Sequence, residues 1–93
     1  MKISFEEAFS HFVTGNLIDI RDESSYIKGH IPSAIHIYSN ELLYHTSKYL
    51  DRNKVYYLYC DYGYISDDIS RRLNQMGYHT FSIIGGYRNY LLR

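Results

Sequence analysis

The sequence predicts an α/β protein in which a parallel sheet is covered by helices on both faces. Apolar runs typical of strands alternate with segments whose apolar residues recur at helical spacing, and glycine or proline separates most of them. At 93 residues, the chain has the length of one domain, which we expect to cover residues 1–93.

A capping box formed by Ser4 and Glu7 opens the first predicted helix. Its apolar face contains Phe5, Ala8, Phe9 and Phe12. The pair Gly15-Asn16 breaks this helix, and residues 17–20 are typical of a short strand.

Residues 23–28 form a short predicted helix, which Gly29 ends and Pro32 prevents from continuing. Residues 34–37 form another strand. Ser39 can cap the next helix, whose apolar side contains Leu42, Leu43, Tyr49 and Leu50.

The second half of the chain repeats this alternation after a polar break at residues 51–53. Residues 55–59 form an apolar strand, and residues 78–84 form a further strand. The helix between them aligns Ile65, Ile69, Leu73 and Met76, and ends at Gly77. The pair Gly85-Gly86 then turns the chain into a last helix over 87–92.

The single cysteine, Cys60, ends the 55–59 strand and precedes a glycine-containing loop and a helix. A thiol at such a turn faces backbone N–H groups and the positive end of a helix dipole, both of which favour the thiolate. Ligand sites of parallel sheets form beyond the carboxyl ends of the strands. Cys60 is therefore the predicted reactive residue.

Composition excludes several function classes. Ten basic residues balance ten acidic ones without a basic run, so we expect no nucleic-acid binding. No apolar stretch or leader predicts a membrane span or secretion, and a lone cysteine excludes an internal disulfide, so we expect a cytoplasmic protein. We expect no cofactor. We also expect no metal site, because the five histidines lack ligand spacing: His11, His30, His36, His45 and His79.

Three segments, in the expected order, make the chain resemble the rhodanese-like domains. Residues 17–23, with Tyr26 and the turn at 29–34, are similar to the first signature of that family. The strand that ends in Cys60 is similar to its active-site strand, and residues 85–87 to its closing Gly-Gly-aromatic signature. The resemblance covers residues from about Ile3 to Leu92.

The resemblance implies a single rhodanese-like domain with a central, mostly parallel five-stranded sheet and a sulfurtransferase activity. Cys60 would be the nucleophile that carries sulfane sulfur as a persulfide, from a donor to a thiol or cyanide acceptor. Backbone N–H groups of the loop would form an anion cradle over Asp61, Tyr62, Gly63, Tyr64, Ile65 and Ser66. Structural roles would fall to Asp19, Arg21, Gly29, His30, Pro32, Gly85 and Gly86.

The loop departs from the family pattern at two positions. Active members often carry arginines directly after the cysteine and at the fifth position after it, where this chain has Asp61 and Ile65. A carboxylate in place of a cation repels anions, so thiosulfate is expected to be a poor donor. Ser66 occupies the position where related cysteine phosphatases need an arginine, so phosphatase activity is not expected.

Some alternatives remain open at this stage. Ser66 can offer its hydroxyl to a persulfide or cap the following helix. Tyr62 and Tyr64 can form a rim for a thiol or protein partner or cover the end of the sheet. The chain is accordingly expected to be a sulfurtransferase or persulfide carrier, or else a non-catalytic module that binds a partner protein. Its oligomeric state is not predicted.

Overall fold

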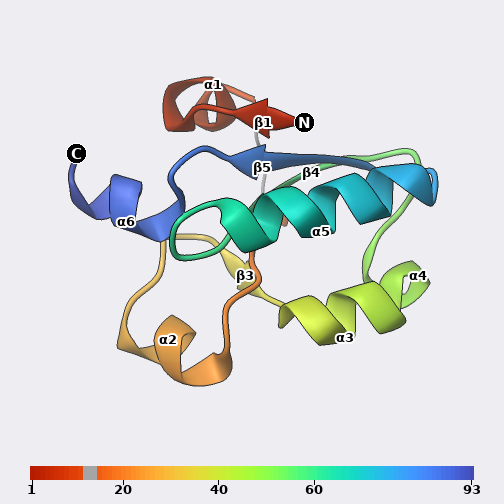
Figure 1. The fold of residues 1–93 in the computed structure, drawn as a ribbon, viewed down its shortest axis with the longest axis horizontal. Coiled ribbons are helices and arrows are strands. Elements are labelled where there is room, and N and C mark those ends of the chain that lie inside the picture. The colour runs from red at the N-terminus through yellow and green to blue at the C-terminus, as the bar shows by residue number, and fades with distance from the viewer. Residues whose placement is uncertain (12–14) are drawn as a thin grey trace.

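The structure is a computed structural model that describes residues 1–11 and 15–93 (Figure 1). Within these residues, five strands form one sheet in the order β1-β5-β4-β2-β3, and every neighbouring pair is parallel. The strands are β1 (Lys2–Ile3), β2 (Leu17–Asp19), β3 (Ile35–His36), β4 (Val55–Tyr59) and β5 (His79–Ile83). The predicted α/β class with a parallel sheet is confirmed.

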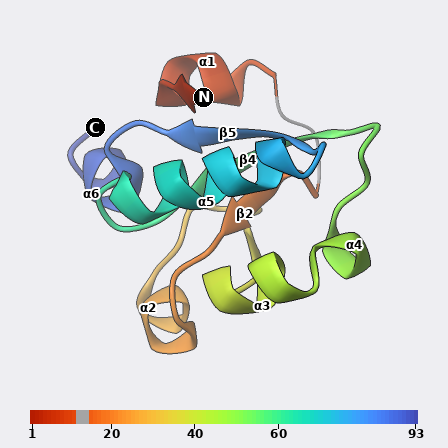
Figure 2. The same ribbon diagram turned by 45° about the vertical axis from the view of Figure 1, so that its right-hand side comes forward.

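Six helices surround the sheet in the described part of the chain. They are α1 (Phe5–Phe9), α2 (Glu23–Lys28), α3 (Ser39–Tyr44), α4 (Thr46–Tyr49), α5 (Tyr64–Gln75) and α6 (Gly86–Leu91). In the views of Figure 1 and Figure 2, α1 lies at the top near β1, α3 and α4 lie toward the bottom, and α5 lies in front of β4 and β5. Residues of α3 and α5 belong to one core cluster and residues of α1 and α6 to the other, so helices cover both faces, as the sequence predicts.

The central strand β4 divides the core into two clusters because successive side chains of a strand point to opposite faces. Tyr57 and Tyr59 join one cluster, with residues of α1 and α6. Tyr56, Leu58 and Cys60 join the other, with residues of α3 and α5. The cysteine thus points from the end of β4 toward the face that α5 covers.

The helix after the Cys60 loop packs through only the middle of its apolar stripe, together with two serines outside that stripe. Ile65 and Met76 are exposed, and the buried residues of α5 are Ser66, Ile69, Ser70 and Leu73. The predicted buried face is therefore wrong at both ends. The reason lies in β5: the Ser66 and Ser70 hydroxyls form hydrogen bonds with the buried Ser82 and Thr80 hydroxyls of that strand.

The helix predicted after Ser39 differs from the expectation in its continuity and in its cap. The helix predicted after Ser39 is split at His45, and its N-cap is Tyr38, which makes no side-chain capping bond. The Thr46 hydroxyl bonds the carbonyls of Leu42 and Leu43 at this break. The two-residue strand β1 was not predicted, since it is too short to show periodicity. Phe12 of the first predicted helix lies outside the described residues.

For the described ranges, we find no helix with the length and apolar character that a membrane crossing requires.

Candidate active site

The Cys60 sulfur lies at the N-terminus of α5, directly beyond β4. Its Sγ accepts hydrogen bonds from the backbone N–H groups of Gly63, at 3.1 Å, and Ser66, at 3.2 Å. Gly63 is the N-cap residue, with φ of 100°, and has no side chain to accept the N–H of the third helical residue. The sulfur takes the place of such a capping side chain. Two donors and the dipole of a 12-residue helix therefore favour negative charge on the sulfur.

Ser66 is the third residue of α5, so of the two roles left open for it, the capping role is excluded. Its hydroxyl is fully buried, lies 3.4 Å from Cys60 Sγ and forms a 2.7 Å hydrogen bond with the Ser82 hydroxyl. Ser82, which sequence reasoning did not single out, thereby fixes a hydroxyl beside the sulfur.

The start of α6 holds the backbone of the Cys60 loop. The N–H groups of Tyr87 and Arg88 donate to the carbonyls of Cys60, at 2.8 Å, and Asp61, at 3.0 Å. These bonds need a close approach at Gly86, where an added Cβ would overlap the Cys60 carbonyl oxygen. Gly85, the N-cap of α6, turns the chain into this approach in the left-handed conformation.

Arg21 forms a buried ion pair with Asp19 below the loop. Its Nη2 donates to Asp19 Oδ2 at 2.7 Å and to the Gly29 carbonyl at 2.6 Å. The guanidinium also lies 4.2 Å from the centre of the Tyr87 ring. Burial opposes its charge, but the hydrogen bond and charge of Asp19, together with the hydrogen bond of Asp61, raise the pKa of Arg21 above its ordinary value.

Asp61 also pairs with Arg21, at 3.3 Å between Oδ1 and Nη1, and its side chain is 57% exposed. Sequence reasoning treated Asp61 as an unpaired carboxylate beside the thiol. The cluster of Asp19, Arg21 and Asp61 contains two acids and one base, so it retains a net charge of about −1. The loop is thus less repulsive to anions than the sequence implies, but it is not cationic.

The turn of the first signature supports this cluster. His30 Nδ1 lies 2.8 Å from the Tyr26 carbonyl oxygen, and the two rings stack. The Ile31 N–H donates to the Tyr59 hydroxyl, which sequence reasoning did not identify. Burial, together with the Asp19 carboxylate, raises the pKa of Tyr59. Pro32 follows in the exposed part of the turn.

The outer surface of the loop exposes three large apolar side chains beside Asp61. Tyr62, Tyr64 and Ile65 are 57%, 83% and 60% exposed. A cavity of about 270 Å³ opens beside them, lined by Lys2, Tyr62, Gly63, Tyr64, Ser82, Ile84 and Gly85. Gly63 donates to the sulfur and Ser82 bonds Ser66, so two lining residues of this cavity also belong to the hydrogen-bond network around the sulfur.

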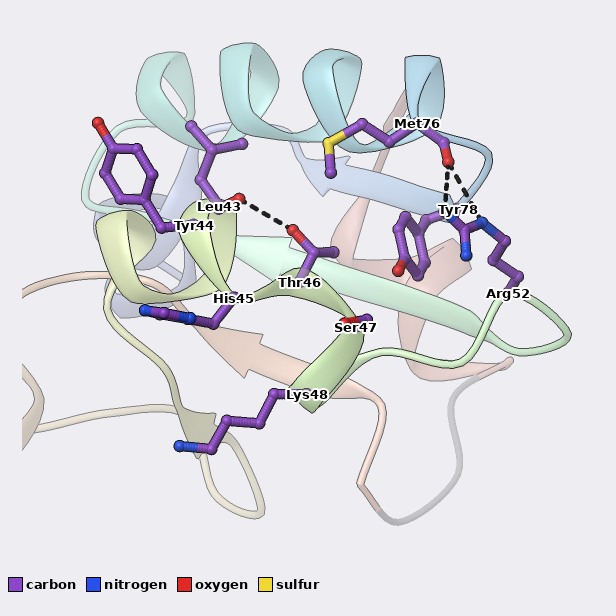
Figure 3. Close-up of a pocket in the computed structure, with 9 residues that line it drawn as sticks. All are labelled: Leu43, Tyr44, His45, Thr46, Ser47, Lys48, Arg52, Met76 and Tyr78. Atoms are coloured by element: carbon purple, nitrogen blue, oxygen red, sulfur yellow. Dashed lines mark hydrogen bonds between the residues drawn. The ribbon is translucent and has the colours of Figure 1, made fainter.

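A second groove, of about 360 Å³, lies at the opposite end of the sheet (Figure 3). At one edge of this groove, Arg52 donates to the Met76 carbonyl at 3.0 Å and stacks on Tyr78. This arginine provides a hydrogen-bond donor to a backbone carbonyl at the C-terminus of α5, which is a structural role. Over the residues described, no group of three potential metal ligands was found.

Comparisons with known proteins point to one family. The sequence model of the family described as "Rhodanese-like domain" matches residues 4–92. A tRNA sulfurtransferase from Pyrobaculum aerophilum is 36% identical over 67 residues, which are 72% of this chain and 14% of that protein. A thiosulfate sulfurtransferase from Coxiella burnetii is 31% identical over 75 residues, or 80% of this chain and 69% of that protein.

Solved structures share the fold. A rhodanese-related protein from Thermoplasma volcanium superimposes with a TM-score of 0.85 and 25% identity, covering 98% of this chain and 90% of that one. A human single-domain sulfurtransferase has a TM-score of 0.80 and 22% identity, covering 99% of this chain and 96% of that one.

Proposed function

The chain belongs to the rhodanese-like domain family, and we propose that it is a sulfurtransferase or persulfide carrier in which Cys60 carries the sulfane sulfur. The observation that supports this most directly is the pair of N–H donors, from Gly63 and Ser66, on the Cys60 sulfur. The two relatives, a thiosulfate sulfurtransferase and a tRNA sulfurtransferase, support the same activity class.

The proposed reaction has two steps that balance without an external oxidant. The Cys60 thiolate attacks the outer sulfur of a donor persulfide, the donor S–S bond breaks, and the donor leaves as a thiolate. An acceptor thiolate then attacks the outer sulfur of the Cys60 persulfide, and Cys60 leaves as a thiolate. The outer sulfur is the only group transferred.

The loop residues have distinct roles in this proposal. The N–H groups of Gly63 and Ser66 stabilise the Cys60 thiolate before the first step and when it leaves in the second. The Ser66 hydroxyl, 3.4 Å from the sulfur, is close enough to stabilise the same thiolate charge by a hydrogen bond. Gly86 keeps the loop in this geometry through the adjacent N–H groups of α6.

A persulfide donor suits this loop better than thiosulfate does. Thiosulfate carries two negative charges close to the transferred sulfur, and residues 60–66 contain one carboxylate and no cation. In the Asp19–Arg21–Asp61 cluster, the one cation already pairs with two carboxylates, so it is not available to an anionic donor. Low-molecular-weight and protein persulfides place less charge at the reacting sulfur.

Incubation with several sulfur donors tests this function. The purified protein is treated separately with thiosulfate, glutathione persulfide and cyanide-labile polysulfide, and its intact mass is then measured. We expect a gain of one sulfur atom, removed by cyanide and absent in Cys60→Ser. The absence of a persulfide on Cys60 with every donor would refute the proposal.

The second candidate function is a non-catalytic module that binds a partner protein. The exposed Tyr62, Tyr64 and Ile65 around the loop favour it, because contiguous exposed apolar side chains mark interaction surfaces. Cys60→Ser separates the two candidates. A folded variant that keeps the cellular role supports the binding module, and one that loses this role supports sulfur transfer.

A further inference from the structure

Arg88 differs from the other arginines of the chain in its partners. Its guanidinium has no hydrogen bond or ion pair within residues 1–11 and 15–93. Each of the other five bonds a carboxylate or a carbonyl oxygen: Arg21, Arg52, Arg71, Arg72 and Arg93. Arg88 therefore keeps its charge available for a ligand.

Its position links that charge to the Cys60 loop. The Arg88 N–H donates to the Asp61 carbonyl, which fixes this turn of α6 against the loop. The Arg88 guanidinium lies 5.7 Å from the centre of the Tyr62 ring, and Tyr62 is two residues beyond Cys60. The cation is thus held at the outer surface of the loop, and the sulfur is buried within it.

The neighbouring cations are less suited to this role. Arg21 is 7% exposed and committed to Asp19 and Asp61. Lys2 lines the cavity beside Tyr62, but its ammonium lies 4.0 Å from Asp67. Lys28 lines a separate groove, which Tyr62 does not line.

We propose that Arg88 recognises the remote carboxylate of a small anionic persulfide whose outer sulfur reaches Cys60. This deepens the proposed function and rests on it. A cation beyond Tyr62 cannot neutralise a charge that adjoins the transferred sulfur, as in thiosulfate. It can pair with a carboxylate several bonds away, as in a persulfide of cysteine or glutathione. Arg88 is then a specificity-determining residue supplied by α6 and not by the loop.

The kinetic test compares a charged with an uncharged donor. Arg88→Gln is expected to raise KM for glutathione persulfide about three- to tenfold at low salt, with kcat retained. KM for the neutral 2-hydroxyethyl persulfide should not change, and Arg88→Lys should restore most of the affinity. Arg72→Gln is the matched control, because it removes the same charge from the exposed side of α5.

Alkylation of Cys60 tests the residue independently of sulfur transfer. The probe is N-iodoacetyl-β-alanine, whose carboxylate lies several bonds from the reacting carbon. The ratio of its rate to that of neutral iodoacetamide reports the potential beyond Tyr62, and Arg88→Gln should lower this ratio about two- to fivefold. An unchanged ratio, or no reaction of Cys60 with either reagent, overturns the proposal. An equal rise in KM for both persulfides also overturns it, because such a rise indicates a structural role. A change in KM or in the rate ratio that occurs in Lys28→Gln but not in Arg88→Gln overturns it as well. If no donor forms a persulfide but the ratio falls, the proposed function fails and the anion site stands.

Discussion

The Asp61 carboxylate lies 3.3 Å from the Arg21 guanidinium, which also binds the buried Asp19 carboxylate. The Arg21–Asp61 pair joins the Cys60 loop, which follows β4, to the end of β2, the neighbour of β4 in the sheet. The loop is therefore held both by α6, through its backbone, and by Arg21, through a side chain.

Asp61→Asn should make Cys60 more reactive toward anions. The asparagine removes one negative charge near the sulfur but keeps an oxygen that can accept from Arg21. We expect faster alkylation of Cys60 by iodoacetate and a thiosulfate rate about two- to fivefold higher, a small gain because the carboxylate is exposed and already paired. The rates of alkylation and of cyanolysis measure the two effects.

Asp68→Asn is the control for this change, since Asp68 pairs with Arg72 on the exposed side of α5. A gain of the same size in both variants would mean that net charge, and not the position of Asp61, limits the reaction.

Gly86→Ala should destabilise the protein and displace the loop. Its Cβ would overlap the carbonyl groups of Cys60 and Asp61, which are backbone atoms and cannot move alone. We expect a loss of about 3 kcal/mol in the free energy of unfolding, together with loss of persulfide formation by the fraction that remains folded. Urea unfolding and intact mass measure these outcomes.

Gly77→Ala is the matched control because Gly77 also has a positive φ. Its Cβ would meet the flexible Arg52 side chain, so we expect a loss of only about 1 kcal/mol and a normal persulfide. Equal losses in the two variants would contradict the role of the close approach.

Periodicity predicted the fold because the sheet is parallel and its strands are apolar on both faces. The β4 run is one example, since Tyr56 and Tyr57 both lie in cores. It failed where small polar residues form the core: Ser66 and Ser70 of α5 pair with hydroxyls of β5 and do not register as a buried face. Single-sequence patterns contain no information on such pairs.

The site was predictable in its centre and less so at its edges. Cys60 followed from its place between a strand and a helix. The pairing of Arg21 with Asp61 joins residues 40 positions apart, and the contact of Arg88 with Tyr62 joins α6 to the loop. Such contacts depend on how the strand ends meet, and local sequence does not encode them.

Ser66→Ala should separate the two contributions of Ser66 to the sulfur. The variant keeps the N–H that bonds Cys60 Sγ and removes only the hydroxyl. We expect a persulfide to form, at a rate lowered about two- to tenfold, by rapid-quench mass measurement. Ser70→Ala removes an equally buried hydroxyl that bonds Thr80, and it should lower stability without changing this rate. An unchanged rate in Ser66→Ala would assign the hydroxyl to packing alone.

The buried Tyr59 hydroxyl should make the protein sensitive to alkaline pH. Its pKa is raised in the folded protein, by burial first and then by Asp19, from an ordinary value of 10.0. The contribution of Tyr59 to the free energy of unfolding is therefore fully present below the pKa that this tyrosine has in the unfolded chain. It is lost as pH rises through that value toward the pKa in the folded protein.

Tyr59→Phe should weaken this pH dependence while lowering stability at neutral pH. At pH 7, the variant should lose about 1–2 kcal/mol in the free energy of unfolding, because the Ile31 N–H loses its acceptor. Above about pH 10, the slope of unfolding free energy against pH should be shallower than in the wild type, by up to about 1.4 kcal/mol per unit. Urea unfolding at several pH values measures both, and Tyr64→Phe, at an 83% exposed position, should change neither. Parallel curves for wild type and Tyr59→Phe would show that Tyr59 ionises as readily in the folded protein as in the unfolded chain.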